Sequence, residues 1–347
     1  MRKSVAMAAA VVFLIVAVLV SALVGAADLN PVDTATALLD QIPFVRLPAG
    51  LTPIDRAVLF QIRLPRIVLG ALVGGLLSVA GAGYQGVFRN YLVDSGMLGV
   101  SAGSGLGATI AIVYLGGLGA GAVPVAAFIG ALAGVLIATG AGILGSAGAY
   151  FGNTALGGGT ATLLLAGVAV GMFLTAVQTF ILQRSTQVLE QVYSWLLGSL
   201  ASATWSQVLE ILPYAAVSAA IILLHGRHLD VLAVGDEEAR ALGVSPRGVR
   251  LIMIFACALA AASAVAVSGL IGFVGIIIPH IARRLAGPSY RTVLPLSLLG
   301  GAGFLVLADT LARTVLAPAE LPIGVVTAFV GAPAFIWVLR RTSPVGT

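Results

Sequence analysis

The chain has 347 residues, of which 59% are hydrophobic and only 9% are charged, and its mean hydropathy is +1.10. A soluble domain of this length needs far more polar surface, so the composition excludes soluble enzymes and soluble binding modules. The formal charge of +5 comes from basic residues near the ends of apolar runs, which is typical of membrane topology and not of nucleic-acid binding. The 44 glycines predict close packing of membrane helices. We therefore expect an all-α integral membrane protein.

The chain contains a series of apolar segments, and most of them are near the length of roughly 20 residues that one membrane crossing needs. Their number predicts about ten transmembrane helices. The first segment could instead be a cleaved signal peptide, because Arg2 and Lys3 precede it and Ala26 and Ala27 lie near its end. The expected crossings lie at about 5–27, 57–88, 94–115, 119–147, 161–183, 207–224, 251–269, 272–285, 293–314 and 323–340.

An even number of crossings puts both termini on one side of the membrane. Arg2 and Lys3 at one end of the chain and Arg340 and Arg341 at the other predict that this side is the cytoplasm. Residues 192–203 are amphipathic and too short to cross, so they predict a short helix on the outer, periplasmic side.

The segment Arg63-Leu64-Pro65-Arg66 stands where an apolar run begins. An arginine exposed to lipid costs several kcal/mol, so these two side chains should face water or a partner protein. Arg313 lies one helical turn from Asp309 near the same outer end of a later segment. Two interpretations stay open for it: a structural ion pair with Asp309, or a third docking cation beside Arg63 and Arg66.

The longest polar interval, residues 225–250, lies on the cytoplasmic side of this topology. Its acidic run from Asp236 to Glu238 suits a helix N-terminus, and Gly243 suits a C-terminal cap. Ser245 and Pro246 then form an N-cap followed by a first-turn proline. The pattern predicts short helices joined by a tight turn, and a solvated loop is the alternative.

Several chemistries are excluded by the residues that the sequence contains. Lys3 is the sole lysine, so no phosphate-binding loop of the form GxxxxGK[ST] exists and the chain is not an ATPase. Cys257 is the sole cysteine, which excludes an intrachain disulfide, and we expect no metal site. The run Gly103-Ser-Gly105-Leu-Gly107 weakly matches a dinucleotide fingerprint, but its apolar context favours helix packing. An ion-coupled secondary transporter would place acidic residues in mid-membrane, and the segments have almost none.

The motifs in their order resemble the FecCD/BtuC-type permeases of bacterial ABC importers. The match covers most of the chain and runs through RLPR, AGAGYQGVFRNYLVDSGMLGVSAGSGLGA, LLLAGVAV, YSWLLGS, GDEEARALGV, GLIGFVGIIIPHIARRL, LADTLAR and ELPIGVVTAFVGAPAFIWVLRR. The resemblance implies a type II importer permease fold, with residues 1–347 as a single transmembrane domain in the inner or plasma membrane. It also implies a homodimer, two cytoplasmic subunits that use ATP and Mg²⁺, and an external substrate-binding protein. The permease itself would bind no cofactor and catalyse no reaction.

The resemblance also assigns roles to individual residues. Arg63, Arg66 and Arg313 match the arginines that meet acidic residues of the binding protein, and Asn90 and Leu92 match the cytoplasmic gate. The residues that match the ATPase-coupling helices are Asp236, Glu237, Glu238, Ala239, Arg240, Leu242, Gly243, Ser245 and Pro246.

Two points of the resemblance bear on what the chain transports. Tyr91 and Ser95 replace prolines that are usual in the family's gate loop, which puts the rigidity of that loop in question. The run YSWLLGSLASATW is closest to members that import iron complexes, so we expect a ferric siderophore or heme as substrate. Cobalamin is the alternative within the same family.

Overall fold

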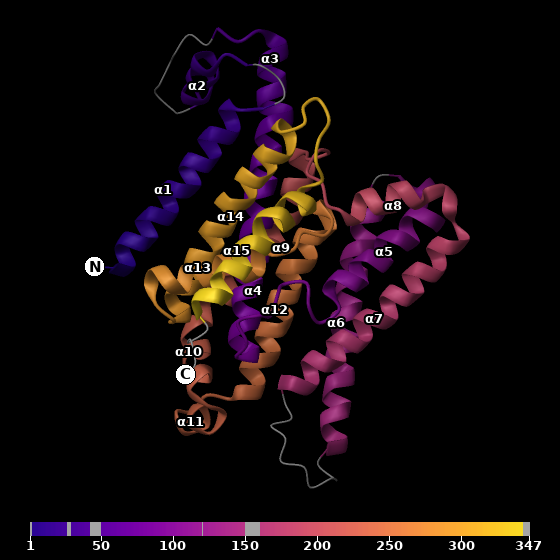
Figure 1. The fold of residues 1–347 in the computed structure, drawn as a ribbon, viewed down its shortest axis with the longest axis vertical. Helices are drawn as coiled ribbons and strands as arrows, with labels where there is room; N and C mark the ends of the chain where they lie inside the picture. Colours follow the sequence, from indigo (N-terminus) through magenta and orange to yellow (C-terminus); the bar gives the residue numbers. More distant parts are fainter. Residues whose placement is uncertain (1, 26–28, 42–49, 120, 150–159, 343–347) are drawn as a thin grey trace.

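The computed structural model describes residues 2–25, 29–41, 50–119, 121–149 and 160–342, and its regular structure in these ranges is entirely helical. The longer helices form a bundle (Figure 1), and each coincides with one of the expected crossings. They are α1 (Arg2–Leu23), α4 (Leu64–Phe88), α5 (Val100–Tyr114), α6 (Ala122–Ala149), α7 (Thr160–Arg184), α9 (Trp205–Leu224), α12 (Pro246–Ser268), α13 (Val274–Ala286), α14 (Tyr290–Thr314) and α15 (Ile323–Thr342).

Among the described residues, 7 helices are long and apolar enough to cross a membrane. The others are α5, α13 and α15, of which α5 has 15 residues and α13 has 13. Both are shorter than the roughly 20 residues of an unaided crossing. The chain is thus a multi-pass membrane protein, and about ten crossings remains a prediction.

Short helices connect the long ones. They are α2 (Pro31–Leu39), α3 (Pro53–Ala57), the π-helical turn η1 (Val58–Arg63), the 3₁₀ turns η2 (Gly116–Leu118) and η3 (Thr186–Val188), α8 (Leu189–Leu196), α10 (Gly226–Val234) and α11 (Asp236–Ala241). We call the end of the bundle that carries α2 and α3 the α2 end, and the opposite end the α11 end (Figure 1). Helices α2 and α3 were not predicted from the sequence, although Asn30 and Thr52 cap them and a proline follows each cap.

Two predicted boundaries are wrong for local backbone reasons. The helix expected at 192–203 ends at Leu196, because Gly198 adopts a φ of +75° and Ser199 then donates its backbone N–H to the carbonyl of Ser268. The crossing expected from 94 begins only at Val100, because Leu98 and Gly99 both have positive φ, of +60° and +86°.

Glycines set the spacing between the central helices. A Cβ on Gly74 of α4 would clash with the backbone of Gly301 in α14, and one on Gly81 would clash with the backbone of Gly275 in α13. Gly103 of α5 meets α6 in the same way. The interpretation of the Gly103 run as a helix-packing surface is therefore confirmed.

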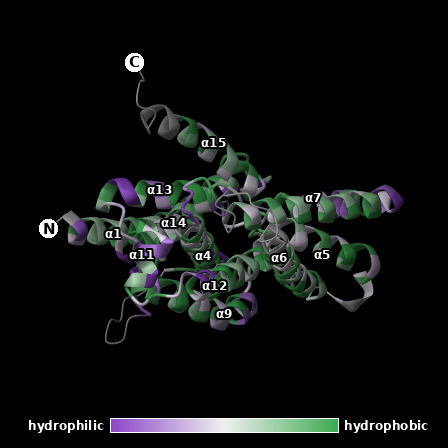
Figure 2. Ribbon diagram, turned by 90° about the horizontal axis from the view of Figure 1, so that it is seen from below, coloured by the Kyte–Doolittle hydropathy of each residue, from purple (hydrophilic) through white to green (hydrophobic). Residues whose placement is uncertain are grey.

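Helix α4 is buried along nearly its whole length and lies among α12, α13 and α14 (Figure 2). Helix α1 packs on α14, where Gly303 lies against Phe13 and Leu14. Helices α5 to α8 form a second group, and α6 of this group packs against α12. Figure 2 shows that α15 extends away from the rest of the bundle.

Candidate functional site

At the α2 end, Arg66 of α4 is enclosed by two carboxylates. Its guanidinium donates to both carboxylate oxygens of Asp309 in α14 at 2.9–3.0 Å, and to both oxygens of Glu320 at 2.8 and 3.0 Å. Arg66 is 7% exposed and Asp309 is 2% exposed. Bidentate, charge-assisted bonds of this kind are strong, and a buried charge that loses its partner is costly.

Arg63 and Arg313 both bond to the end of α1. Arg63 donates to the carbonyl of Ala22 at 2.8 Å, and Arg313 donates to the carbonyl and the hydroxyl of Ser21 at 2.6 Å. Cations are stabilised at a helix C-terminus because its last carbonyls are unpaired and carry the negative end of the helix dipole. The two arginines therefore attach α1 to the junction of η1 with α4 and to α14.

The expectation that Arg63 and Arg66 could face water is wrong, because they are 3% and 7% exposed. Arg313 is also buried, at 5% exposed, and contact of the three arginines with a binding protein stays a prediction. Of the two interpretations of Arg313, the structural pair is present, but it is loose, with Nε 3.8 Å from Asp309. The tighter partner of Asp309 is Arg66, which lies 243 residues away in the chain. Spacing along one helix could not reveal that partner.

At the α11 end, the polar interval folds as its capping residues predict. Helix α11 begins at Asp236, and the chain turns at Gly243 with a φ of +78°. The Ser245 hydroxyl caps the next helix by accepting from the backbone N–H of Gly248 at 3.3 Å, with Pro246 at the first helical position. One part of the prediction needs correction: the helix that starts at Pro246 is not short, since it continues as the membrane helix α12.

The coupling residues divide into an outer and an inner set. Ala239 of α11 and Pro246 at the start of α12 are buried, and Asp236 is half-buried. The exposed set, which a partner protein could contact, is Glu237, Glu238, Arg240, Leu242, Gly243 and Ser245.

The Asp236 carboxylate faces two arginines of the chain itself. Arg250 of α12 donates to its two oxygens at 2.7 and 2.6 Å, and Arg89 at the end of α4 makes a second ion pair with it. The hydrogen bonds from Arg250, followed by the charges of Arg250 and Arg89, lower the pKa of Asp236 below its usual value. Asp236 therefore stays ionised at neutral pH.

Nearby, Asp230 of α10 has a structural role that the sequence does not indicate. Its carboxylate accepts from the Ser289 hydroxyl at 2.7 Å and from the backbone N–H of Tyr290 at 2.6 Å. It therefore caps the first turn of α14 from another helix, which no local motif could indicate.

The gate loop, residues 89–99, joins α4 to α5. The Asn90 side chain accepts from the backbone N–H of Leu92 at 2.9 Å and so fixes a tight turn. Asn90 and Leu92 line a cavity of about 280 Å³ together with Gly167, Val168 and Gly171 of α7. The two predicted gate residues are thus brought together against the neighbouring helix.

Interactions with α13 hold the gate loop where the prolines are missing. The Gln85 amide donates to the carbonyls of Val93 and Gly275 at 3.1 and 3.0 Å. Arg283 of α13 bonds to the same Gln85, and its guanidinium lies over the Tyr91 ring, 4.2 Å from the centroid.

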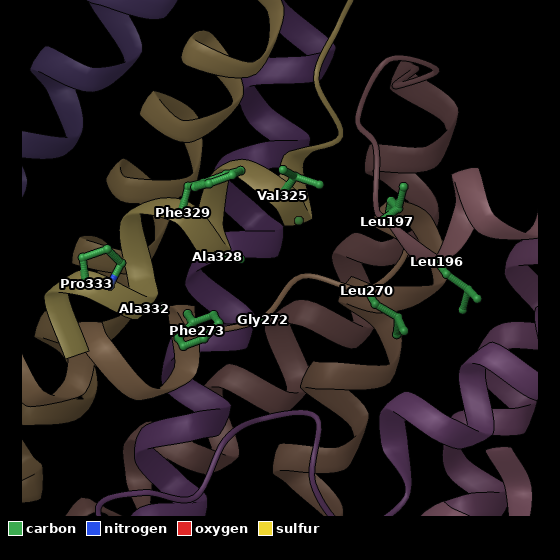
Figure 3. A pocket seen from close by; sticks show the side chains of 11 residues that line it. Leu196, Leu197, Leu270, Gly272, Phe273, Val325, Ala328, Phe329, Ala332 and Pro333 are labelled. Carbon is green, nitrogen blue, oxygen red and sulfur yellow. The ribbon is translucent and has the colours of Figure 1, made fainter. Parts of the chain in front are cut away.

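A second cavity, of about 580 Å³, lies between α15 and the segments around Leu197 and Phe273 (Figure 3). Its wall is apolar, with Leu270, Val325 and Phe329 among its side chains. A surface of this kind suits lipid or another apolar helix and offers no group that could bind a metal. Among the described residues, no group of three or more His, Cys, Asp or Glu could hold a metal ion.

Comparison with known proteins places these features in one family. Residues 13–341 match the model of the FecCD transport family. The uncharacterized ABC transporter permease protein YvrB of Bacillus subtilis is 41% identical over 292 residues, which are 83% of this chain and 80% of YvrB. The cobalamin import permease BtuC of Halobacterium salinarum is 40% identical over 85% of this chain and 76% of its own length. The hemin transport permease HmuU of Yersinia pestis is 40% identical over 81% of this chain and 82% of its own length.

A solved structure supports the same assignment. It is an inward-facing ABC transporter assigned to the metal-chelate type, with a TM-score of 0.79 and 28% identity over 96% of this chain and 98% of the other. The chain belongs to the FecCD transport family, the family of type II ABC importer permeases that work with separate ATPase subunits.

Proposed function

We propose that this chain is the permease subunit of an importer that takes up an iron complex, either a ferric siderophore or heme, delivered by an external binding protein. The observation that carries the proposal is the family match over residues 13–341, which includes nearly the whole bundle. Relatives at 40% and 37% identity are permeases for hemin and for iron(3+)-hydroxamate. The sequence run from Tyr193 to Trp205 favours the iron-complex members.

The assembly that we propose contains two copies of this chain, two ATP-binding subunits and one binding protein. Helix α7 offers an apolar surface for a second copy, because Met172 and Phe173 are 70% and 67% exposed. In a homodimer, these helices would line a central pathway with few charges. Weak contacts along the pathway suit the passage of a large complex, whose affinity would reside in the binding protein.

We assign the α11 end to the cytoplasmic side of the inner or plasma membrane. Arginines gather there, including Arg227, Arg240, Arg247 and Arg291, as the positive-inside rule requires. Both termini are then cytoplasmic. The exposed residues of α11 would contact the ATPase, which alone would use ATP and Mg²⁺.

The binding protein would dock at the α2 end. Because Arg63, Arg66 and Arg313 are buried, we assign them the role of fixing the shape of that end through α1, α4 and α14. Direct pairing with acidic residues of the binding protein would require Arg66 to exchange Glu320, the one partly exposed carboxylate of the cluster, for a partner's carboxylate.

Cobalamin import is the second candidate, and the 40% identity with the cobalamin permease of Halobacterium salinarum supports it. An ion-coupled secondary transporter has less support. Its coupling would require an acidic group free to titrate within the membrane, whereas Asp309 is paired with Arg66.

The experiment is uptake into proteoliposomes that contain the chain with its ATPase and binding protein. Ferric siderophores, heme and cobalamin are offered in parallel, with an ATPase subunit unable to hydrolyse ATP as the matched control. We expect ATP-dependent accumulation of an iron complex only with the active ATPase. Accumulation of cobalamin alone would select the second candidate. Uptake that follows a proton or sodium gradient without ATP would reject the importer proposal.

A further inference from the structure

One carboxylate at the α11 end joins three separate elements. Asp236 is the first residue of α11, and it is bonded at once to Arg250 in the first turns of α12 and to Arg89 at the end of α4. Arg89 has a φ of +50°, which ends α4, and the next residue is Asn90. The arginine that pairs with α11 is therefore the first residue of the gate loop.

The gate loop is also fixed at a second place, on a different helix. Gln85 bonds to the carbonyls of Val93 and Gly275, and Arg283 of α13 stacks on Tyr91. The start of the loop is thus tied to α11, while its middle is held against α13. A displacement of α11 relative to α13 must change the shape of the residues between these two attachments.

We propose that Asp236 is the residue through which α11 controls the gate loop, by its ion pair with Arg89, and that it does not contact the ATPase. This inference rests on the proposed function, since it takes α11 as the part that the ATPase moves. The Asp236 side chain points toward Arg89 and Arg250 of the same chain. Glu237 and Glu238 next to it are exposed and free to face a partner. A partly exposed ion pair of this kind holds a loop in place and still breaks and reforms within a working cycle.

A purely structural role predicts different behaviour. An acid in the first turn of α11 also stabilises that helix through its dipole, and Arg250 alone would satisfy the carboxylate. If Asp236 did only this, removing the charge of Arg89 would leave the gate loop unchanged. The test therefore compares Arg89 with Asp236.

The experiment measures maleimide labelling of Leu92→Cys in membranes that contain the complete complex, with and without ATP. Leu92 is 51% exposed, and Cys257 is fully buried, so the unmodified chain supplies the background. The test variants are Arg89→Gln and Asp236→Asn, and the conservative variants are Arg89→Lys and Asp236→Glu. The matched control is Arg247→Gln, which removes an exposed charge of the same kind one turn from Arg250.

Without nucleotide, we expect both test variants to raise the labelling rate about fivefold, the change that about 1 kcal/mol produces. With ATP, the change in labelling seen in the parent should be lost in both test variants and kept in Arg89→Lys, Asp236→Glu and Arg247→Gln. Labelling in Arg89→Gln that equals that of Arg247→Gln in both conditions would overturn the inference, whatever the labelling in Asp236→Asn. The nucleotide-free comparison needs no transport, so it still decides whether the ion pair holds the loop if the parent complex fails to import any substrate.

Discussion

The buried cluster around Arg66 gives a graded prediction for stability. In Arg66→Met, Asp309 would keep only the loose contact with Arg313 at 3.8 Å, although it is 2% exposed. Removing one partner of a buried ion pair costs about 3–5 kcal/mol, because the other charge is left uncompensated. For a chain of this size we expect a fall in melting temperature of roughly 4–7 °C.

The other two members of the cluster should matter less. Asp309→Asn leaves Arg66 paired with Glu320, so its cost in stability should lie between those of Arg66→Met and Glu320→Gln. Glu320→Gln removes a carboxylate whose side chain is 35% exposed, and partly exposed pairs contribute about 1 kcal/mol or less. The double variant Arg66→Met with Asp309→Leu removes both charges of the Arg66–Asp309 pair and should recover part of the stability lost in Arg66→Met alone.

The assay is thermal unfolding of the purified chain in one detergent. The measured quantity is the fraction of the chain that still elutes as a monodisperse peak after heating. The expected order of loss is Arg66→Met, then Asp309→Asn, then Glu320→Gln. A melting temperature for Arg66→Met equal to that of the parent would refute the reasoning. If that variant also lost affinity for the binding protein while staying fully stable, Arg66 would be a docking residue instead of a structural one.

Three further predictions concern helix packing and the gate loop. Gly103→Val should lower the melting temperature, because the new side chain must separate α5 from α6, at a cost of about 1–3 kcal/mol; an unchanged value would contradict the packing. The pKa of Asp236 is lower in the folded protein than its unfolded value of about 3.9. Its ion pairs therefore stabilise the protein fully above the unfolded pKa, and progressively less as the pH falls through the folded pKa. The difference in melting temperature between the parent and Asp236→Asn should vanish in acid. A difference that stays constant from neutral pH to pH ~3 would contradict this linkage. Tyr91→Ala should raise labelling of Leu92→Cys by removing the ring beneath Arg283, whereas Tyr91→Phe should not, and equal rates in the two variants would argue against the stacking.

The sequence by itself determined the long apolar helices and several helix ends. A membrane helix satisfies its backbone hydrogen bonds within one segment, so an apolar run is enough to predict it. Caps are local in the same way, which is why Ser245, Pro246 and Gly243 could be interpreted correctly. The motifs also identified the family, which the match over residues 13–341 confirms.

Only the tertiary structure decided which charges meet. Arg66 pairs with Asp309 across 243 residues, and Arg89 pairs with Asp236 across 147. The sequence places each arginine at a helix end. At such a position, an arginine that faces water and an arginine that is buried and paired give the same sequence pattern. Which of the two occurs depends on the crossing of α1, α4 and α14, and that crossing is set by glycine contacts between segments far apart in the chain.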